Sequence, residues 1–143
     1  MDYTDGTDTI TFSIENIDMN DPVQKPIIAM DVYCEYKASY STNTASGYKI
    51  EEQAEDSHYN DNRNICLTEN DCFSLYLLDI PPEVSVMSLS DTVINSVKYT
   101  DVLILQKENL SSEEKVDKII HNHQVGLIQF RDNETGKTWS RFF

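Results

Sequence analysis

Residues 27 to 40 read IIAMDVYCEYKASY, and their alternation decides the fold class. Apolar residues and tyrosines fill the even positions from Ile28 to Tyr40, whereas Asp31, Glu35 and Lys37 fill odd positions. A period of two turns one side of a β-strand to a core and the other to water, and a helix would scramble that pattern. We therefore predict a long strand over residues 27–40.

The segments on either side extend this pattern to a mainly β fold. Residues 9–15 alternate in the same way, and we expect that strand to end before Asn20-Asp21-Pro22 because proline interrupts a strand ladder. Turn-forming residues follow Tyr40, and Tyr48 and Ile50 then resume the alternation, which predicts a hairpin returning along the long strand. Further strands are predicted at residues 73–77, 84–89, 97–105, 125–130 and 137–143, with Trp139 in the core.

One segment is typical of a helix. Ser111 and Glu114 form a capping box, and apolar residues recur at helical spacing from Val116 to Ile120. We expect an amphipathic helix near residues 111–123. The predicted fold is thus mainly β, at the margin of α+β: a single domain over residues 1–143, built as an antiparallel β-sandwich of about seven to eight strands with this helix packed on it.

Residues 51–64 read EEQAEDSHYNDNRN and contain almost nothing to bury. Their composition predicts a long acidic loop, and loops of that length in compact domains are often functional.

The acidity of the chain is one-sided. The net charge is −14; residues 1–97 hold 18 acidic and four basic residues, whereas residues 98–143 hold seven of each. Such a field repels nucleic acids and anionic membranes and attracts a basic protein surface, so we predict a protein partner and neither of the other two. A merely solvated acidic face is the alternative interpretation.

The compartment is predicted from apolar runs and cysteines. No apolar run approaches the length of a bilayer span, and the first residues, MDYTD, are acidic, so we expect no signal peptide or transmembrane segment. The chain has an odd number of cysteines, Cys34, Cys66 and Cys72, and it has no CxxC motif. Both observations favour three reduced thiols in the cytoplasm or within a particle. A bond from Cys66 to Cys72, closing a small loop in an extracellular protein, is the alternative.

No catalytic, cofactor or metal motif stands out. The four glycines are isolated, so neither a phosphate-binding loop nor a serine nucleophile elbow is present. His121 and His123 would point apart at the end of a helix, and we interpret them as favourable charges at its C-terminus; in an extended chain they would share a face. We predict no cofactor and no catalytic or metal-binding residue.

These observations favour a non-enzymatic protein-binding or structural module that self-associates or joins a larger assembly such as a viral or phage particle. An acidic inhibitor that mimics nucleic acid against a basic groove is the second hypothesis, and a small hydrolase or carbohydrate-active domain is the third. The candidate partner-binding residues are Tyr33, Tyr36, Tyr40, Tyr48, Glu51, Glu52, Glu55, Asp56 and Asp61.

Overall fold

The computed structural model describes the backbone of residues 1–24, 32–42, 47–56, 61–76, 78 and 80–142. Side chains are described for the same residues except 14–24, 32–42, 54–56, 61 and 62.

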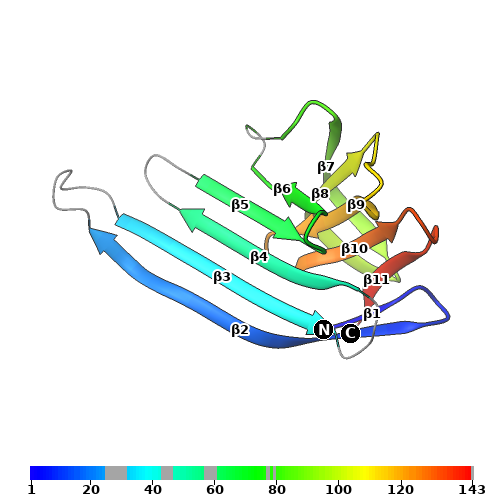
Figure 1. Cartoon of the computed structure of the whole chain (residues 1–143), viewed down its shortest axis with the longest axis horizontal. Helices are drawn as coiled ribbons and strands as arrows, with labels where there is room; N and C mark the ends of the chain where they lie inside the picture. Colours follow the sequence, from blue (N-terminus) through cyan, green and yellow to red (C-terminus); the bar gives the residue numbers. More distant parts are fainter. Residues whose placement is uncertain (25–31, 43–46, 57–60, 77, 79, 143) are drawn as a thin grey trace. The chain divides into compact units, whose positions relative to one another are not determined.

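Eleven antiparallel strands form the regular structure of the described residues, which contain no helix (Figure 1). Within these ranges, therefore, no helix is long and apolar enough to cross a membrane. The prediction of a mainly β, antiparallel fold is confirmed. The strands are β1 (Asp2–Thr4), β2 (Thr9–Gln24), β3 (Val32–Thr42), β4 (Lys49–Asp56), β5 (Asp61–Cys66), β6 (Cys72–Ser74), β7 (Val84–Ile94), β8 (Val97–Lys107), β9 (Val116–Asn122), β10 (Gly126–Asp132) and β11 (Thr138–Phe142).

The chain divides into two compact units, one formed by residues 1–11 with 81–143 and the other by residues 12–80. β2 contributes its first residues to the first unit and the rest of its length to the second. The single domain and the face-to-face packing of a sandwich stay predictions.

The first unit is an antiparallel sheet in the order β1, β11, β10, β9, β8, β7, with the start of β2 paired to β1. Aromatic residues from both ends of the chain meet in its core. Tyr3 is fully buried, its hydroxyl donates to the carbonyl of Leu127 at 2.8 Å, and its ring centroid lies 5.7 Å from that of Phe130. The Trp139 ring stacks on the Phe130 ring, with centroids 6.4 Å apart. Trp139 is buried, which confirms its predicted place in the core.

The predicted helix at residues 111–123 is wrong, because β9 occupies most of it. β9 lies between β8 and β10, and every residue of the strand except Lys118 is buried. A strand that is buried on both faces loses the period of two, so its apolar residues fell at helical spacing by coincidence. Ser111 and Glu114 form a turn in which the Glu114 amide donates to the Ser111 carbonyl at 3.2 Å.

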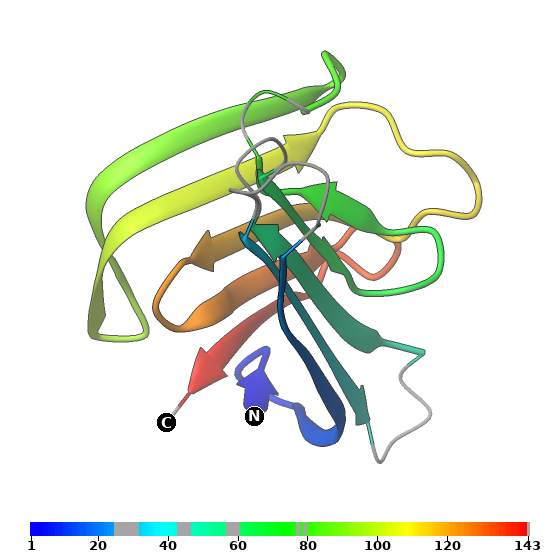
Figure 2. The same cartoon turned by 90° about the vertical axis from the view of Figure 1, so that its left-hand side faces the viewer.

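β7 and β8 form a long hairpin that curves along its length (light green in Figure 2). Asn95 and Ser96 connect the strands with φ of 50° and 66°, the two positive values that a type I′ turn requires. β9 pairs with β8 from Val102 to Gln106, and among the described strands the half of the hairpin nearer the turn is paired only within itself.

Residues 12–80 form a meander in which each strand pairs with the next, from β2 to β6. The predicted strand at 27–40 is confirmed over 32–40, and residues 27–31 lie outside the described ranges. The hairpin that returns along it is confirmed too, since β4 pairs antiparallel with β3 from Lys49 to Asp56.

β2 continues through Asp21 and Pro22, so the prediction that it ends before them is wrong. The register with β3 shifts between Asn20 and Val23. Proline is tolerated at such an irregularity because the ladder there lacks a regular hydrogen bond for its missing N–H.

The predicted acidic loop at residues 51–64 is also wrong in its structure. Residues 51–56 belong to β4 and residues 61–64 to β5, and only 57–60 lie outside the described ranges. β4 is paired on both edges, by β3 and β5, so its backbone hydrogen bonds hold a strand that the side-chain composition does not favour.

Candidate interaction surfaces

The predicted tyrosine residues fall into two groups. Tyr33, Tyr36 and Tyr40 lie in β3, and the register sets Tyr36 opposite Ala54 of β4; their side chains are outside the described part of the structure. Tyr48 is buried, with 6% of its surface exposed. Tyr48 is therefore a core residue, and its prediction as a contact residue is wrong.

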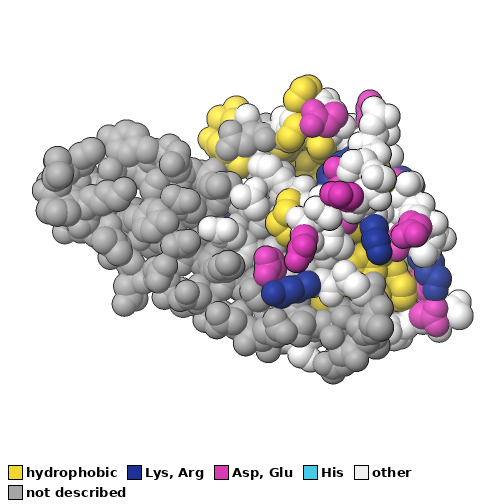
Figure 3. Space-filling view, viewed as in Figure 1, with side chains coloured by type: hydrophobic (Ala, Val, Ile, Leu, Met, Phe, Trp, Pro, Cys, Tyr) yellow, Lys and Arg dark blue, Asp and Glu magenta, His cyan; other side chains and the backbone are white. Residues whose placement is uncertain are grey.

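The predicted acidic residues are brought together on neighbouring strands. Glu51 and Glu52 lie in β4 and are partly exposed, and Lys49 pairs with Glu51 at 3.0 Å. Figure 3 shows such acidic and basic side chains side by side on the described part of the face in view. Glu55, Asp56 and Asp61 are placed by their backbone in β4 and β5.

The register of these strands sets acidic residues directly opposite one another. Glu55 pairs with Glu35 of β3, and Asp56 pairs with Asp61 of β5. Like charges at directly opposed positions destabilise a sheet. Glu35 was missed as a candidate because only the strand pairing, which the sequence does not show, brings it next to Glu55.

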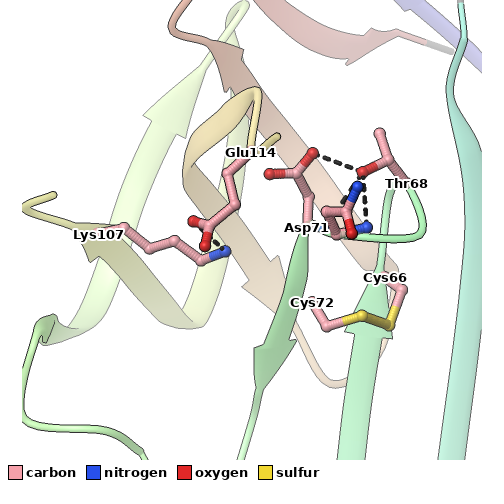
Figure 4. Close-up of a disulfide and its surroundings, with 7 residues drawn as sticks. Cys66, Thr68, Asp71, Cys72, Lys107 and Glu114 are labelled. Carbon is pink, nitrogen blue, oxygen red and sulfur yellow. Dashed lines mark hydrogen bonds and ion pairs between the residues drawn. A yellow bond between two sulfur atoms is a disulfide. The ribbon is translucent and has the colours of Figure 1, made fainter. Parts of the chain in front are cut away.

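Cys66 and Cys72 form a disulfide between β5 and β6 (Figure 4). They are directly opposed in the register, with Cα atoms 4.0 Å apart. The prediction of three reduced cysteines is wrong, and the argument for a reducing compartment loses its basis with it. Two cysteines six residues apart, at the matched ends of two strands around turn-forming residues, were the signal that favoured the alternative.

The loop that the disulfide closes is held by its own polar groups. The Leu67 amide donates to the Asp71 carbonyl at 2.9 Å, and the Thr68 hydroxyl donates to the Asp71 carboxylate at 2.6 Å (Figure 4). Asp71 is fully buried. These contacts fix the loop tightly between its two strands.

A cavity of about 230 Å³ lies in the first unit. One carboxylate in its wall, Asp117, accepts hydrogen bonds at 2.9 and 3.1 Å from the Nε of Arg131, and this bonding raises the pKa of Arg131. The wall therefore holds one buried carboxylate in an ion pair, Asp117, and a second carboxylate, Glu108, that is exposed. The cavity is lined by Lys107, Glu108, Asn109, Leu110, Asp117 and Asn133.

His121 and His123 lie at the end of β9 and in the turn after it, so the interpretation as charges at a helix C-terminus is wrong. His121 is buried and His123 is exposed, and their rings meet edge to face with centroids 6.0 Å apart. Among the residues with described side chains, no group of three His, Cys, Asp or Glu is placed to hold a metal ion.

Lys137 joins the turn between β1 and β2 to the turn before β11. Its ammonium group lies 2.9 Å from the Asp5 carboxylate and 2.5 Å from that of Asp8. The Asp5 carboxylate also accepts the backbone amides of Asp8 and Thr7 at 2.6 and 2.8 Å. The Asp8 amide first, then Lys137, lowers the pKa of Asp5 from 3.8 to about 2, and the two carboxylates raise the pKa of Lys137 to about 12.

Replacing Lys137 by glutamine is expected to raise the pKa of Asp5 without restoring its ordinary value, because the two amide donors remain. A carboxyl group with a lowered pKa stabilises the fold above its unfolded pKa, and that contribution is lost as pH falls from about 4 toward 2. An NMR titration of the Asp5 carboxyl carbon measures the shift, with Lys115→Gln as the control. An Asp5 titration that Lys137→Gln leaves unchanged would contradict this assignment.

The structure leaves the candidate partner-binding residues, Tyr48 excepted, on three neighbouring strands of one sheet. No family model matches the chain, and no curated protein or solved structure matches it either.

Proposed function

We propose that this chain is a non-enzymatic protein-binding or structural module, and that the acidic strands β3, β4 and β5 bind a basic surface of another protein. The observation that carries the proposal is the direct opposition of Glu35 to Glu55 and of Asp56 to Asp61. Each such pair is expected to cost roughly 0.2–1 kcal/mol in the free sheet. A cationic partner relieves that repulsion, so part of the binding energy comes from a cost already present in the unbound protein.

The same carboxylates support a second candidate, an inhibitor that mimics nucleic acid. Acidic residues on three adjacent strands form an array of negative charge that a basic nucleic-acid groove would accept. The two functions differ in competition: duplex DNA competes with a mimic for the nucleic-acid groove of its target, whereas it does not displace this chain from a basic protein surface that binds no nucleic acid. A component of a viral or phage particle is the context we propose for the first function.

Neutralising the predicted acidic residues is expected to abolish capture of basic proteins. The variant changes Glu51, Glu52 and Glu55 to glutamine and Asp56 and Asp61 to asparagine. Immobilised wild type and variant are compared in a pull-down from the source lysate and in binding of poly-lysine, at low and high salt. Salt should weaken wild-type binding because screening acts on exposed charges.

A matched control removes the same number of charges at exposed positions outside these strands. Binding that falls equally in the variant and in this control would reflect net charge alone and would count against the proposal. Equal binding by wild type and variant would do the same. The control substitutions are Glu69→Gln, Glu83→Gln, Asp101→Asn, Glu108→Gln and Glu113→Gln.

A further inference from the structure

β7 is an edge strand with an open side. It stands at the end of the strand order and pairs, among the described strands, with β8 alone. Seven of its eleven residues are exposed, and the apolar ones include Met87 and Val93, with 56% and 64% of their surface exposed. An exposed edge of this length presents a row of backbone donors and acceptors to another strand.

β7 lacks the usual devices that prevent edge pairing. The strand, VSVMSLSDTVI, contains no lysine and no proline, and its register with β8 is the same on both sides of Ser90, the one residue that the ladder skips. Natural proteins commonly protect edges with lysine, proline or bulges. Their absence indicates that this edge is used for pairing.

Charge selects the kind of strand that can approach. In a chain of net charge −14, β7 carries one acidic residue, Asp91, and Lys98 of β8 neutralises it at 2.9 Å. A basic partner gains no electrostatic attraction from this neutral edge. A second copy of the same chain is repelled by the net charge of −14, and at this edge it meets a strand whose acidic residue is neutralised.

The sequence of β7 is complementary to itself when two copies run antiparallel about Leu89. Each residue then faces a partner on the same side of the sheet: Val84 faces Ile94, Val86 faces Thr92, and Ser88 faces Ser90. Asp91 faces Met87 of the other copy and not its own counterpart, which avoids opposed like charges.

We propose that two copies of this chain pair through β7, antiparallel and centred on Leu89, to join their sheets into one. This self-association uses a different unit from the acidic strands and does not rest on the proposed function. The interface is isologous, with Met87 contacting Asp91 of the second copy twice across the two-fold axis.

Charge substitutions at Met87 test both the dimer and its register. Met87→Lys places a cation opposite Asp91 and is expected to tighten the dimer, whereas Met87→Asp opposes like charges and weakens it. Because each contact occurs twice, we expect a change in the dissociation constant of roughly two- to thirty-fold in each direction. Sedimentation equilibrium over a range of concentrations measures it, and within one chain Met87 faces Ile104, so neither change creates a new charge pair there.

Asp91→Asn completes a double-mutant cycle, because it removes the charge that Met87→Lys is proposed to contact. The gain from Met87→Lys should disappear in the double variant. Ser112→Lys and Ser112→Asp, at an exposed site outside β7, repeat the same changes in net charge and should have no such effect. Circular dichroism identifies any variant that fails to fold, and amide exchange of wild-type β7, slower at high protein concentration, then provides an independent readout.

A wild-type chain that stays monomeric at all concentrations, together with a monomeric Met87→Lys variant, would overturn the proposal. So would a dimer whose stability neither Met87 variant changes, since that dimer would use another surface.

Discussion

Loss of the Cys66–Cys72 disulfide is expected to lower the free energy of unfolding of residues 12–80 by roughly 2 kcal/mol. The bond closes a loop with a sequence separation of six, and the loop-closure entropy of so short a loop corresponds to about that value. The Cys66→Ser, Cys72→Ser double variant, compared with the oxidised parent by urea denaturation, measures the difference. Hydrogen exchange of the β4, β5 and β6 amides locates it.

The control for this experiment is Cys34→Ser in both proteins, which prevents exchange of the bond with the third thiol. Thiol titration of the oxidised wild-type chain should find one reactive thiol per denatured molecule, because two of the three cysteines are bonded. Three thiols in protein purified without reductant, or equal stability of the two variants, would contradict the pairing.

Phe130→Ala is expected to lower the free energy of unfolding of the other unit by about 3–5 kcal/mol. Phe130 is fully buried between the rings of Tyr3 and Trp139, so truncation leaves a cavity that these large rings cannot fill without moving. Thermal and urea denaturation measure the loss, with tryptophan fluorescence reporting directly on Trp139.

Phe142→Ala is the matched control, because Phe142 lies in the neighbouring strand β11 and is 40% exposed. Its loss should cost much less than that of Phe130, since a partly exposed side chain leaves a smaller cavity or none. Equal effects of the two substitutions would contradict the aromatic core described here.

Strands with one buried face could be predicted from the sequence, and strands with two similar faces could not. Ile10 and Phe12 are buried while Thr11 and Ser13 are exposed, so the period of two was visible in the sequence. β9 is buried on both faces, and its residues resembled a helix. In β4 the residues after Ile50 are mostly polar, so only the pairing partners on each side reveal a strand.

The candidate site was predicted in part for the same reason. Composition located the acidic residues, because charge can be counted along the chain. It could not reveal that Glu35 stands opposite Glu55, since that depends on the exact register of β3 and β4, nor that Tyr48 is buried, since that depends on tertiary packing. The edge position of β7 likewise follows from the strand order and from no residue within it.

The pairing of β1 with β11 imposes an order on folding during synthesis. Every strand pair of the meander from β2 to β6 joins sequence neighbours, so those strands can assemble while the ribosome still holds the rest of the chain. The residue whose carbonyl accepts the hydrogen bond of the Tyr3 hydroxyl, Leu127, is synthesised 124 residues after Tyr3. A nascent chain stalled before β10 therefore carries a first strand that β2 pairs on one edge only, together with an exposed aromatic ring, and this is the species that a chaperone would need to protect.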